Sequence, residues 1–139
     1  MLLVIAATPQ ELAGAAGART LVCGIGPREA YLATEDAVAE GGADGVLHVG
    51  IAGARSGSGI PLLATVVGTE AVDCDGDSEP IAPAAKLLAA CLDEGVPALE
   101  LRVVSNEVEE PDRALWRFDD ALAELARVTA LVIAEIERT

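Results

Sequence analysis

Short, largely apolar runs closed by glycine or another turn residue constrain the fold of this chain more than any other feature. Three such runs lie at 2–6, 20–23 and 46–49. Apolar runs without alternation indicate strands buried on both faces, as in a parallel sheet covered by helices. We expect a fourth strand at 98–104 and an extended segment over 62–72, interrupted at Gly68.

Helical segments alternate with these strands. Cap and stop residues predict a short helix starting at Thr8-Pro9, a helix from Pro27 to Gly41-Gly42, one over 84–93, and a last one from about Asp119 onward. We expect the last helix to bury one apolar face, made of Leu122, Leu125, Ala126, Ile133 and Ile136. Alternating strands and helices predict an α/β fold: one domain over 1–139, with a mixed, mostly parallel sheet flanked by helices.

Composition restricts the classes of function. The formal net charge of the 139 residues is −14, so the surface would repel a nucleic acid backbone, and we expect no nucleic acid partner. The apolar N-terminal run is too short to span a membrane and has no basic leader, so we expect a soluble cytoplasmic protein. The three cysteines show neither a disulfide framework nor zinc-ligand spacing, and we expect no metal and no cofactor.

Two glycine-rich segments follow expected strands and are the candidate ligand-binding turns. They are Gly24-Ile25-Gly26 and Gly50-Ile51-Ala52-Gly53. In open α/β sheets ligands bind at the carboxyl ends of strands, where glycine lets the backbone approach closely. The alternative is a pair of ordinary tight turns. A G-x-G-x-x-G nucleotide motif is absent, because Glu29 occupies its third glycine position.

Four segments taken in order resemble the nucleosidase branch of the purine nucleoside phosphorylase superfamily. They are Ile5–Glu11, Cys23–Gly26, Val49–Ala54 and Glu100–Asn106. The segment 105–118 and Gly50–Ala54 are most similar to the futalosine hydrolase members of that branch, which also includes methylthioadenosine/adenosylhomocysteine nucleosidases. The resemblance implies hydrolysis of a purine N-glycosidic bond by a homo-oligomer that binds a purine nucleoside or base.

The resemblance also assigns candidate site residues. Glu11 matches the carboxylate that activates water; the alternative is a solvated glutamate near a helix N-terminus. Asn106 matches the residue that contacts the purine, and its amide suits a 6-oxopurine; the alternative is a turn-capping residue in a polar loop over 105–112. Ser105 and Arg102 would support that loop, while Gly24–Gly26 and Gly50–Gly53 would line the pocket.

One histidine, His48, lies in the third expected strand. It is either a proton carrier of the site or a strand residue hydrogen-bonded to its neighbours, and we expect the second.

The chain departs from the family between about 73 and 84, where family members are longer. The family's ribose-binding glutamate would fall on Ala82 or Pro83, and spacing does not assign Glu79 to that role. Two interpretations follow: a hydrolase, or a non-catalytic relative that binds a nucleoside or base or acts as an interaction domain. A third interpretation, phosphorolysis, lacks a set of phosphate-binding basic residues, although Arg28 and Arg55 flank the two glycine segments.

Overall fold

The computed structural model describes residues 1–68 and 83–139. Five strands form one sheet in the order β2-β1-β3-β5-β4. Their bounds are β1 Leu2–Ala6, β2 Arg19–Val22, β3 Gly45–Ala54, β4 Thr65–Gly68 and β5 Ala98–Glu107. All neighbouring pairs are parallel except β4 with β5, which is antiparallel. The prediction of a mixed, mostly parallel sheet is therefore confirmed.

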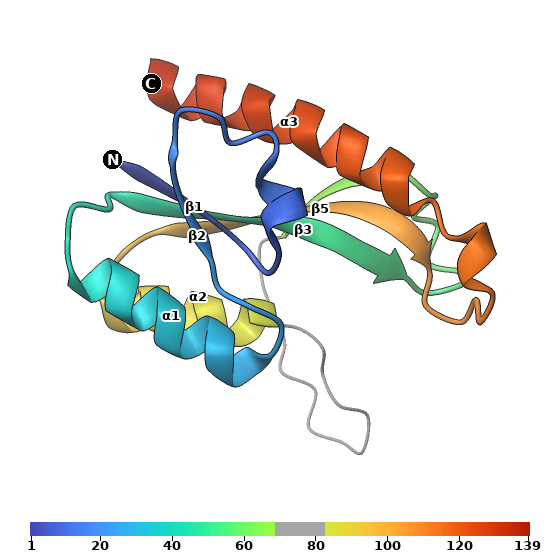
Figure 1. Cartoon of the computed structure of the whole chain (residues 1–139), viewed down its shortest axis with the longest axis horizontal. Coiled ribbons are helices and arrows are strands. Elements are labelled where there is room, and N and C mark those ends of the chain that lie inside the picture. The colour runs from blue at the N-terminus through green and yellow to red at the C-terminus, as the bar shows by residue number, and fades with distance from the viewer. Residues whose placement is uncertain (69–82) are drawn as a thin grey trace.

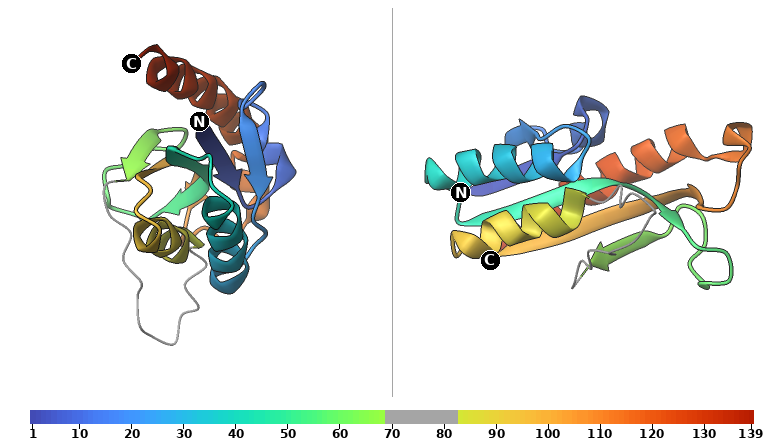
Figure 2. Two further views of the ribbon diagram at one scale, coloured as in Figure 1. Left: turned by 90° about the vertical axis from the view of Figure 1, so that its left-hand side faces the viewer. Right: turned by 90° about the horizontal axis from the view of Figure 1, so that it is seen from below.

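Three long helices cover the two faces of this sheet. The helices α1 (Pro27–Ala39) and α2 (Pro83–Asp93) lie side by side on one face, and α3 (Phe118–Arg138) lies on the other (Figures 1 and 2). Two short 3-10 helices, η1 (Pro9–Leu12) and η2 (Arg113–Leu115), follow β1 and β5. No helix in residues 1–68 or 83–139 is long and apolar enough to cross a membrane.

Each face of the sheet has its own apolar core. Under α3 the core contains Val4, Leu47, Val49, Leu101 and Leu125, among others. Under α1 and α2 it contains Leu3, Ile5, Val46, Leu87 and Cys91, among others. Successive residues of a strand point to opposite faces, so the central strands must be apolar on both sides, which is why their sequence does not alternate.

The second glycine-rich segment is not a turn, and the polar loop expected over 105–112 begins only after Glu107. Gly50–Gly53 is the second half of β3, and Ser105–Glu107 is the end of β5. The reason is that β3 and β5 pair with each other along almost their whole length, from Val46–Ala98 to Ala54–Glu107, with one irregularity after Ala52. Hydrogen bonds to a neighbouring strand hold these glycines extended, which local propensity alone did not indicate.

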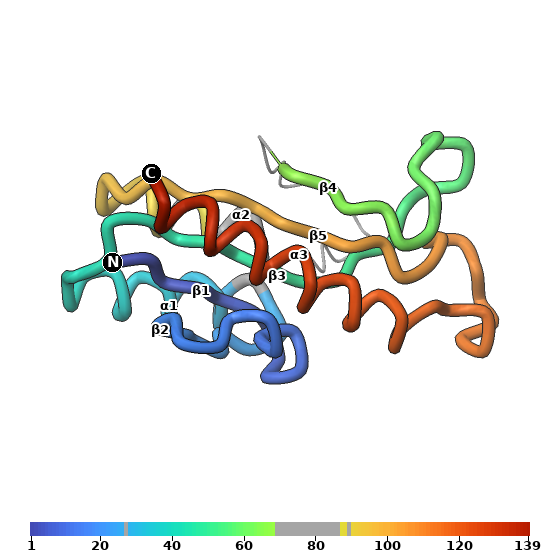
Figure 3. The backbone as a smooth tube through the Cα atoms, turned by 90° about the horizontal axis from the view of Figure 1, so that it is seen from above, coloured from blue at the N-terminus to red at the C-terminus, as the bar shows by residue number. Residues whose placement is uncertain are grey.

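The last helix starts at Phe118, one residue before the predicted position, and its buried face differs in part from the expected one. Leu125 and Ile133 are buried as predicted, whereas Ile136 is 38% exposed. The remaining buried positions are Ala121, Val128 and Thr129. Figure 3 shows the helix passing obliquely over the sheet, and its last turn lies near the N-terminus of the chain. The last turn of α3 therefore covers less of the sheet than we expected from the apolar face that was predicted to include Ile136.

Candidate functional site

The candidate site lies where β1 ends and β3 continues. The last residue pair between these strands is Ile5 with His48, whereas β3 runs on to Ala54 (Figure 1). The short helix η1 follows β1 and occupies the place beside the unpaired part of β3. Parallel strands end at a common edge, and this is the edge at which open α/β sheets bind ligands.

Glu11 lies at this edge and is 7% exposed. One carboxylate oxygen, Oε2, accepts hydrogen bonds from the Thr8 backbone N–H at 3.1 Å and from Thr8 Oγ1 at 2.9 Å. The other oxygen, Oε1, accepts one from the backbone N–H of Ile51 at 3.0 Å. The Thr8-Pro9 helix start, predicted from sequence, thus delivers a carboxylate to β3. Glu11 is not a solvated helix glutamate.

Gly50 opens a small space between Glu11 and Arg102. A Cβ at this position would lie 3.0 Å from Glu11 Oε1 and would overlap Nη1 of Arg102. A carboxylate oxygen and a guanidinium nitrogen therefore face the same space, which only glycine leaves open. The sequence analysis gave Arg102 a supporting role near Asn106 and did not place it beside Glu11. The sequence feature that could have indicated a site role for Arg102 is the charged pair Glu100 and Arg102 in a strand expected to be buried.

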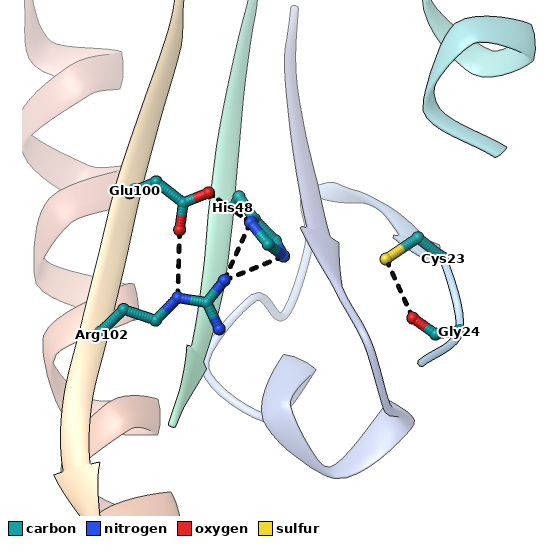
Figure 4. Close-up of polar contacts among 5 residues, drawn as sticks. All are labelled: Cys23, Gly24, His48, Glu100 and Arg102. Carbon is teal, nitrogen blue, oxygen red and sulfur yellow. Dashed lines mark hydrogen bonds and ion pairs between the residues drawn. The ribbon is translucent and has the colours of Figure 1, made fainter. Parts of the chain in front are cut away.

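Next to this space lies a polar network made of two buried side chains, His48 and Glu100, and the half-buried Arg102. Figure 4 shows this network. His48 Nδ1 is hydrogen-bonded to Glu100 Oε1, and Arg102 Nε donates to Glu100 Oε2 at 3.0 Å. Arg102 Nη2 lies 3.0 Å from Nδ1 and 3.3 Å from Nε2 of His48. Since Nδ1–H donates to Glu100, Nε2 is the acceptor on the neutral ring. The prediction that His48 is bonded to its neighbours is confirmed.

Burial and partners set the charge states of this network. Burial lowers the pKa of His48, and the positive charge of Arg102 lowers it further, against the opposing effect of Glu100. Burial raises the pKa of Glu100, but the hydrogen bond from His48 and the charge of Arg102 outweigh it, so the net shift is downward. At neutral pH the network is therefore a neutral imidazole, a carboxylate and a guanidinium.

Asn106 and Ser105 form a second polar group near the end of β5, beside the last residues of β3. Ser105 Oγ donates to Asn106 Oδ1 at 2.8 Å, and Asn106 Nδ2 donates to the Glu107 carbonyl at 2.9 Å. Asn106 is opposite Gly53 in the sheet, and Ser105 Oγ lies 3.3 Å from the Ala52 carbonyl oxygen. Both side chains are buried. Asn106 is a strand residue and does not cap a turn. Within the described part of the chain, one Oδ1 lone pair and one Nδ2 proton make no hydrogen bond.

The Gly24-Ile25-Gly26 segment is a real turn between β2 and α1. Gly24 and Gly26 have φ of +81° and +128°, and Ile25 is 70% exposed. A Cβ at Gly26 would overlap a carboxylate oxygen of Glu29. The Glu29 carboxylate therefore lies at the N-terminus of α1. Among the described residues, no hydrogen bond or ion pair joins this turn to Glu11 or Asn106. The structure thus unites the predicted residues of β3, β5 and η1, but not those of the first glycine turn.

The structure does not test the positions matched to the family's ribose-binding glutamate. Glu79 and Ala82 lie outside the described residues, and of Pro83 only the backbone, at the start of α2, is described. The expectation about the shortened segment stays a prediction.

The fold and the site define a class: a helix-covered, mostly parallel sheet with a carboxylate and a guanidinium at the ends of its central strands. More particularly, the fold is that of the methylthioadenosine/adenosylhomocysteine nucleosidases and of futalosine hydrolase. The resemblance drawn from the four sequence segments is confirmed at the level of the fold. No protein-family model matches the sequence, and no curated protein matches it.

Three solved structures illustrate the similarity. A futalosine hydrolase mutant of Helicobacter pylori superposes with a TM-score of 0.79 at 15% identity, covering 99% of each chain. The methylthioadenosine/adenosylhomocysteine nucleosidase of Neisseria meningitidis, bound to methylthio-immucillin-A, gives 0.71 at 20% identity and covers 97% of each chain. The Streptococcus pneumoniae enzyme, bound to 8-aminoadenine, gives 0.69 at 15% identity, covering 95% of this chain and 96% of that one.

Proposed function

We propose that this protein hydrolyses the N-glycosidic bond of a purine nucleoside, as a futalosine hydrolase-like nucleosidase. The observation that carries the proposal is that Glu11 Oε1 and Arg102 Nη1 both lie where a side chain at Gly50 would be. A carboxylate acts as a base and a guanidinium as a donor, so a water molecule held between them is both activated and oriented. The fold supports the same reaction class, because its solved relatives are nucleosidases.

In the proposed reaction, the water oxygen attacks the anomeric carbon of the ribose while the bond from that carbon to the base nitrogen breaks. Such cleavage passes through an oxocarbenium-like state. Glu11 takes a proton from the water and returns it to solvent, and solvent supplies the proton that the departing base takes up, so that ribose with a new hydroxyl and the free base are the products. The chemistry needs neither a metal nor an organic cofactor.

Asn106 would hold the departing base. Ser105 fixes its Oδ1, and the Glu107 carbonyl fixes its Nδ2. Its free lone pair would accept from a protonated N7, and its free proton would be donated to a carbonyl at C6. This arrangement favours a 6-oxopurine over adenine. Gly50-Ile51-Ala52-Gly53 would form the wall beside the base, where two of four positions lack a side chain, and Gly24, Ile25 and Gly26 would contribute from the β2 side.

We include homo-oligomer formation and a cytoplasmic location in the proposal. Apolar side chains that a partner subunit would cover include Ile25, 70% exposed, and Leu115 and Phe118, exposed by 59% and 47%. Covering exposed apolar side chains with another protein surface removes them from water, which is favourable. A partner of this kind would also supply ligand contacts that the shortened segment lacks.

The test is release of free base from futalosine, inosine, methylthioadenosine and adenosylhomocysteine, with and without phosphate, by wild type and Glu11→Gln. We expect hydrolysis independent of phosphate and a loss of about 100- to 10,000-fold in kcat for the variant, the usual contribution of a general base. The unfolding free energy should fall by only about 1–2 kcal/mol, because glutamine keeps one of the acceptor oxygens. Glu40→Gln removes an exposed carboxylate in the same way and is the matched control.

An unchanged rate in Glu11→Gln would refute the assignment of the base. Absence of release from every nucleoside by the folded wild type would instead favour the non-catalytic relative. Release that requires phosphate would indicate phosphorolysis.

A further inference from the structure

Two buried ionisable side chains have no part in the hydrolysis proposed above, although they lie next to its site. His48 is 0% exposed and Glu100 is 5% exposed. They are directly opposite each other on β3 and β5. The pair below them on the same two strands is Val46 and Ala98, so an apolar pair is sterically suited to this face of the sheet.

Stability alone does not account for a charged pair at this place. Removing a carboxylate from water is costly even when it gains partners, and apolar residues of similar volume often serve stability as well or better. What the pair supplies instead is geometry, because a buried and fully bonded polar group has one defined orientation.

The geometry concerns the guanidinium of Arg102. Its Nε donates to Glu100 Oε2 at 3.0 Å, and its Nη2 lies 3.3 Å from Nε2 of His48. His48 in turn is fixed by the bond from its Nδ1 to Glu100 Oε1. Two of the three guanidinium nitrogens are thus held from one side. Among the residues that the structure describes, the third nitrogen, Nη1, makes no hydrogen bond (Figure 4). This nitrogen lies at the space beside Gly50.

We infer that Glu100 and His48 are positioning residues that hold Arg102 so that its Nη1 is presented to the reacting water beside Glu11. The inference rests on the proposed function for its role in turnover, but the orientation of Arg102 is a property of the protein itself. Without Glu100, the side chain of Arg102 would lose its Nε acceptor and rotate about its aliphatic stem. The positive charge of Arg102 would remain near the site, but Nη1 would no longer be held in the direction of the space at Gly50.

The kinetic test is a cycle of Glu100→Gln, Arg102→Met and the double variant. Displacement by about 1 Å can lower a rate roughly 100-fold, so we expect kcat to fall by about 10- to 100-fold in Glu100→Gln while KM for the nucleoside is unchanged. In the Arg102→Met background, Glu100→Gln should cause no further loss, because it acts through the missing guanidinium. An equal loss in both backgrounds would overturn the inference. The control is Glu40→Gln, which removes an exposed carboxylate just after the end of α1.

A second measurement does not depend on activity or on the Arg102 variant being fully stable. In the ¹H–¹⁵N spectrum of the wild type, the Nε–H of Arg102 should be slow to exchange and shifted by its carboxylate acceptor. The same signal should be lost or moved in Glu100→Gln and unchanged in Glu40→Gln. An unchanged Arg102 signal in Glu100→Gln would overturn the inference even if turnover falls. A wild type that shows the signal but releases no base would refute the proposed function and leave the positioning of Arg102 intact.

Discussion

At the scale of single residues, the site depends on the absence of a side chain as much as on the side chains present. Glu11 and Arg102 belong to η1 and β5, and the strand between them is β3. They face a common space only because residue 50 is a glycine. A glycine in a strand is unfavourable for stability by roughly 0.5–1 kcal/mol relative to alanine, which indicates that the space itself matters at this position.

We therefore expect Gly50→Ala to affect turnover more than stability. The new methyl group would overlap Arg102 Nη1, and it would lie 3.0 Å from Glu11 Oε1. The end of an arginine side chain can move at modest cost, so unfolding should change by about 1 kcal/mol or less, while displacement of the guanidinium should lower kcat by about 100-fold.

The control is Gly45→Ala in the same strand. A Cβ there would be at ordinary contact distance, 3.7 Å from the Pro97 carbonyl oxygen and 3.8 Å from Leu2 Cδ1. Base release and urea unfolding of both variants would be compared with wild type. Full activity in Gly50→Ala would show that the space at Gly50 is not used by the reacting groups.

At the scale of elements, the sequence predicted which segments form strands and helices better than where they end. The apolar run at 2–6 and the cap at Thr8-Pro9 predicted β1 and η1 correctly, because both signals are local. The extension of β3 through Gly50–Gly53 was missed, because it depends on pairing with residues of β5 that come more than fifty positions later in the chain. The sequence also did not indicate that Glu11 and Arg102 lie beside the same space at Gly50, for the same reason.

Glu11 and Asn106 were found from the family resemblance and not from spacing. Nothing local distinguishes Glu11 from a surface glutamate; its burial follows from the N–H of Ile51, which β1 leaves free. Asn106 was expected in a loop and lies in β5, opposite Gly53.

The docking of η1 against α3 is an element-scale contact that fixes Glu11. Gly14 lies just after η1, and a Cβ there would overlap the carbonyl oxygen of Ala126 and lie 2.8 Å from its carbonyl carbon. These are helix backbone atoms, which cannot rotate away as a side chain can. We expect Gly14→Ala to lower the unfolding free energy by about 1–3 kcal/mol, as overpacking does. It should also lower kcat, since η1 and Glu11 would move together.

Urea unfolding and base release of Gly14→Ala, beside Gly45→Ala, would check this prediction. A variant as stable as wild type would contradict the close contact of Gly14 with the backbone of Ala126.

At the scale of the whole molecule, a strongly acidic chain holds its network of opposite charges in the interior. The formal net charge is −14, and the molecule contains a single histidine. Acid therefore acts on stability in two opposite ways. Protonation of surface carboxylates relieves repulsion, chiefly near their usual pKa of about 4, whereas any proton bound between pH 7 and 5.5 by the unfolded chain belongs mainly to His48.

This separation makes the buried network visible in the pH dependence of stability. Burial and Arg102 hold the pKa of His48 below its ordinary value of 6.5, against Glu100 and the more distant Glu11. Below about pH 6.5 the unfolded state therefore binds a proton at His48 that the folded state does not bind. The contribution of the neutral ring to the free energy of unfolding is fully present above about pH 6.5 and is lost as the pH falls below it. The limiting slope for one proton is about 1.4 kcal/mol per pH unit. Glu100, whose pKa is also lowered, adds a loss of the same sign only at lower pH, near its unfolded pKa of about 4.3 and below.

Urea unfolding between pH 7 and 5.5 would measure this slope in wild type and in His48→Asn, which keeps a polar amide but does not titrate. We expect the wild type to lose stability across this range and the variant to show a flatter dependence, whatever its absolute stability. Equal slopes in the two proteins would mean that His48 binds its proton in the folded state as readily as in the unfolded one. The ring would then be an imidazolium beside Arg102, and the neutral acceptor at Nε2 that helps to orient the guanidinium would not exist.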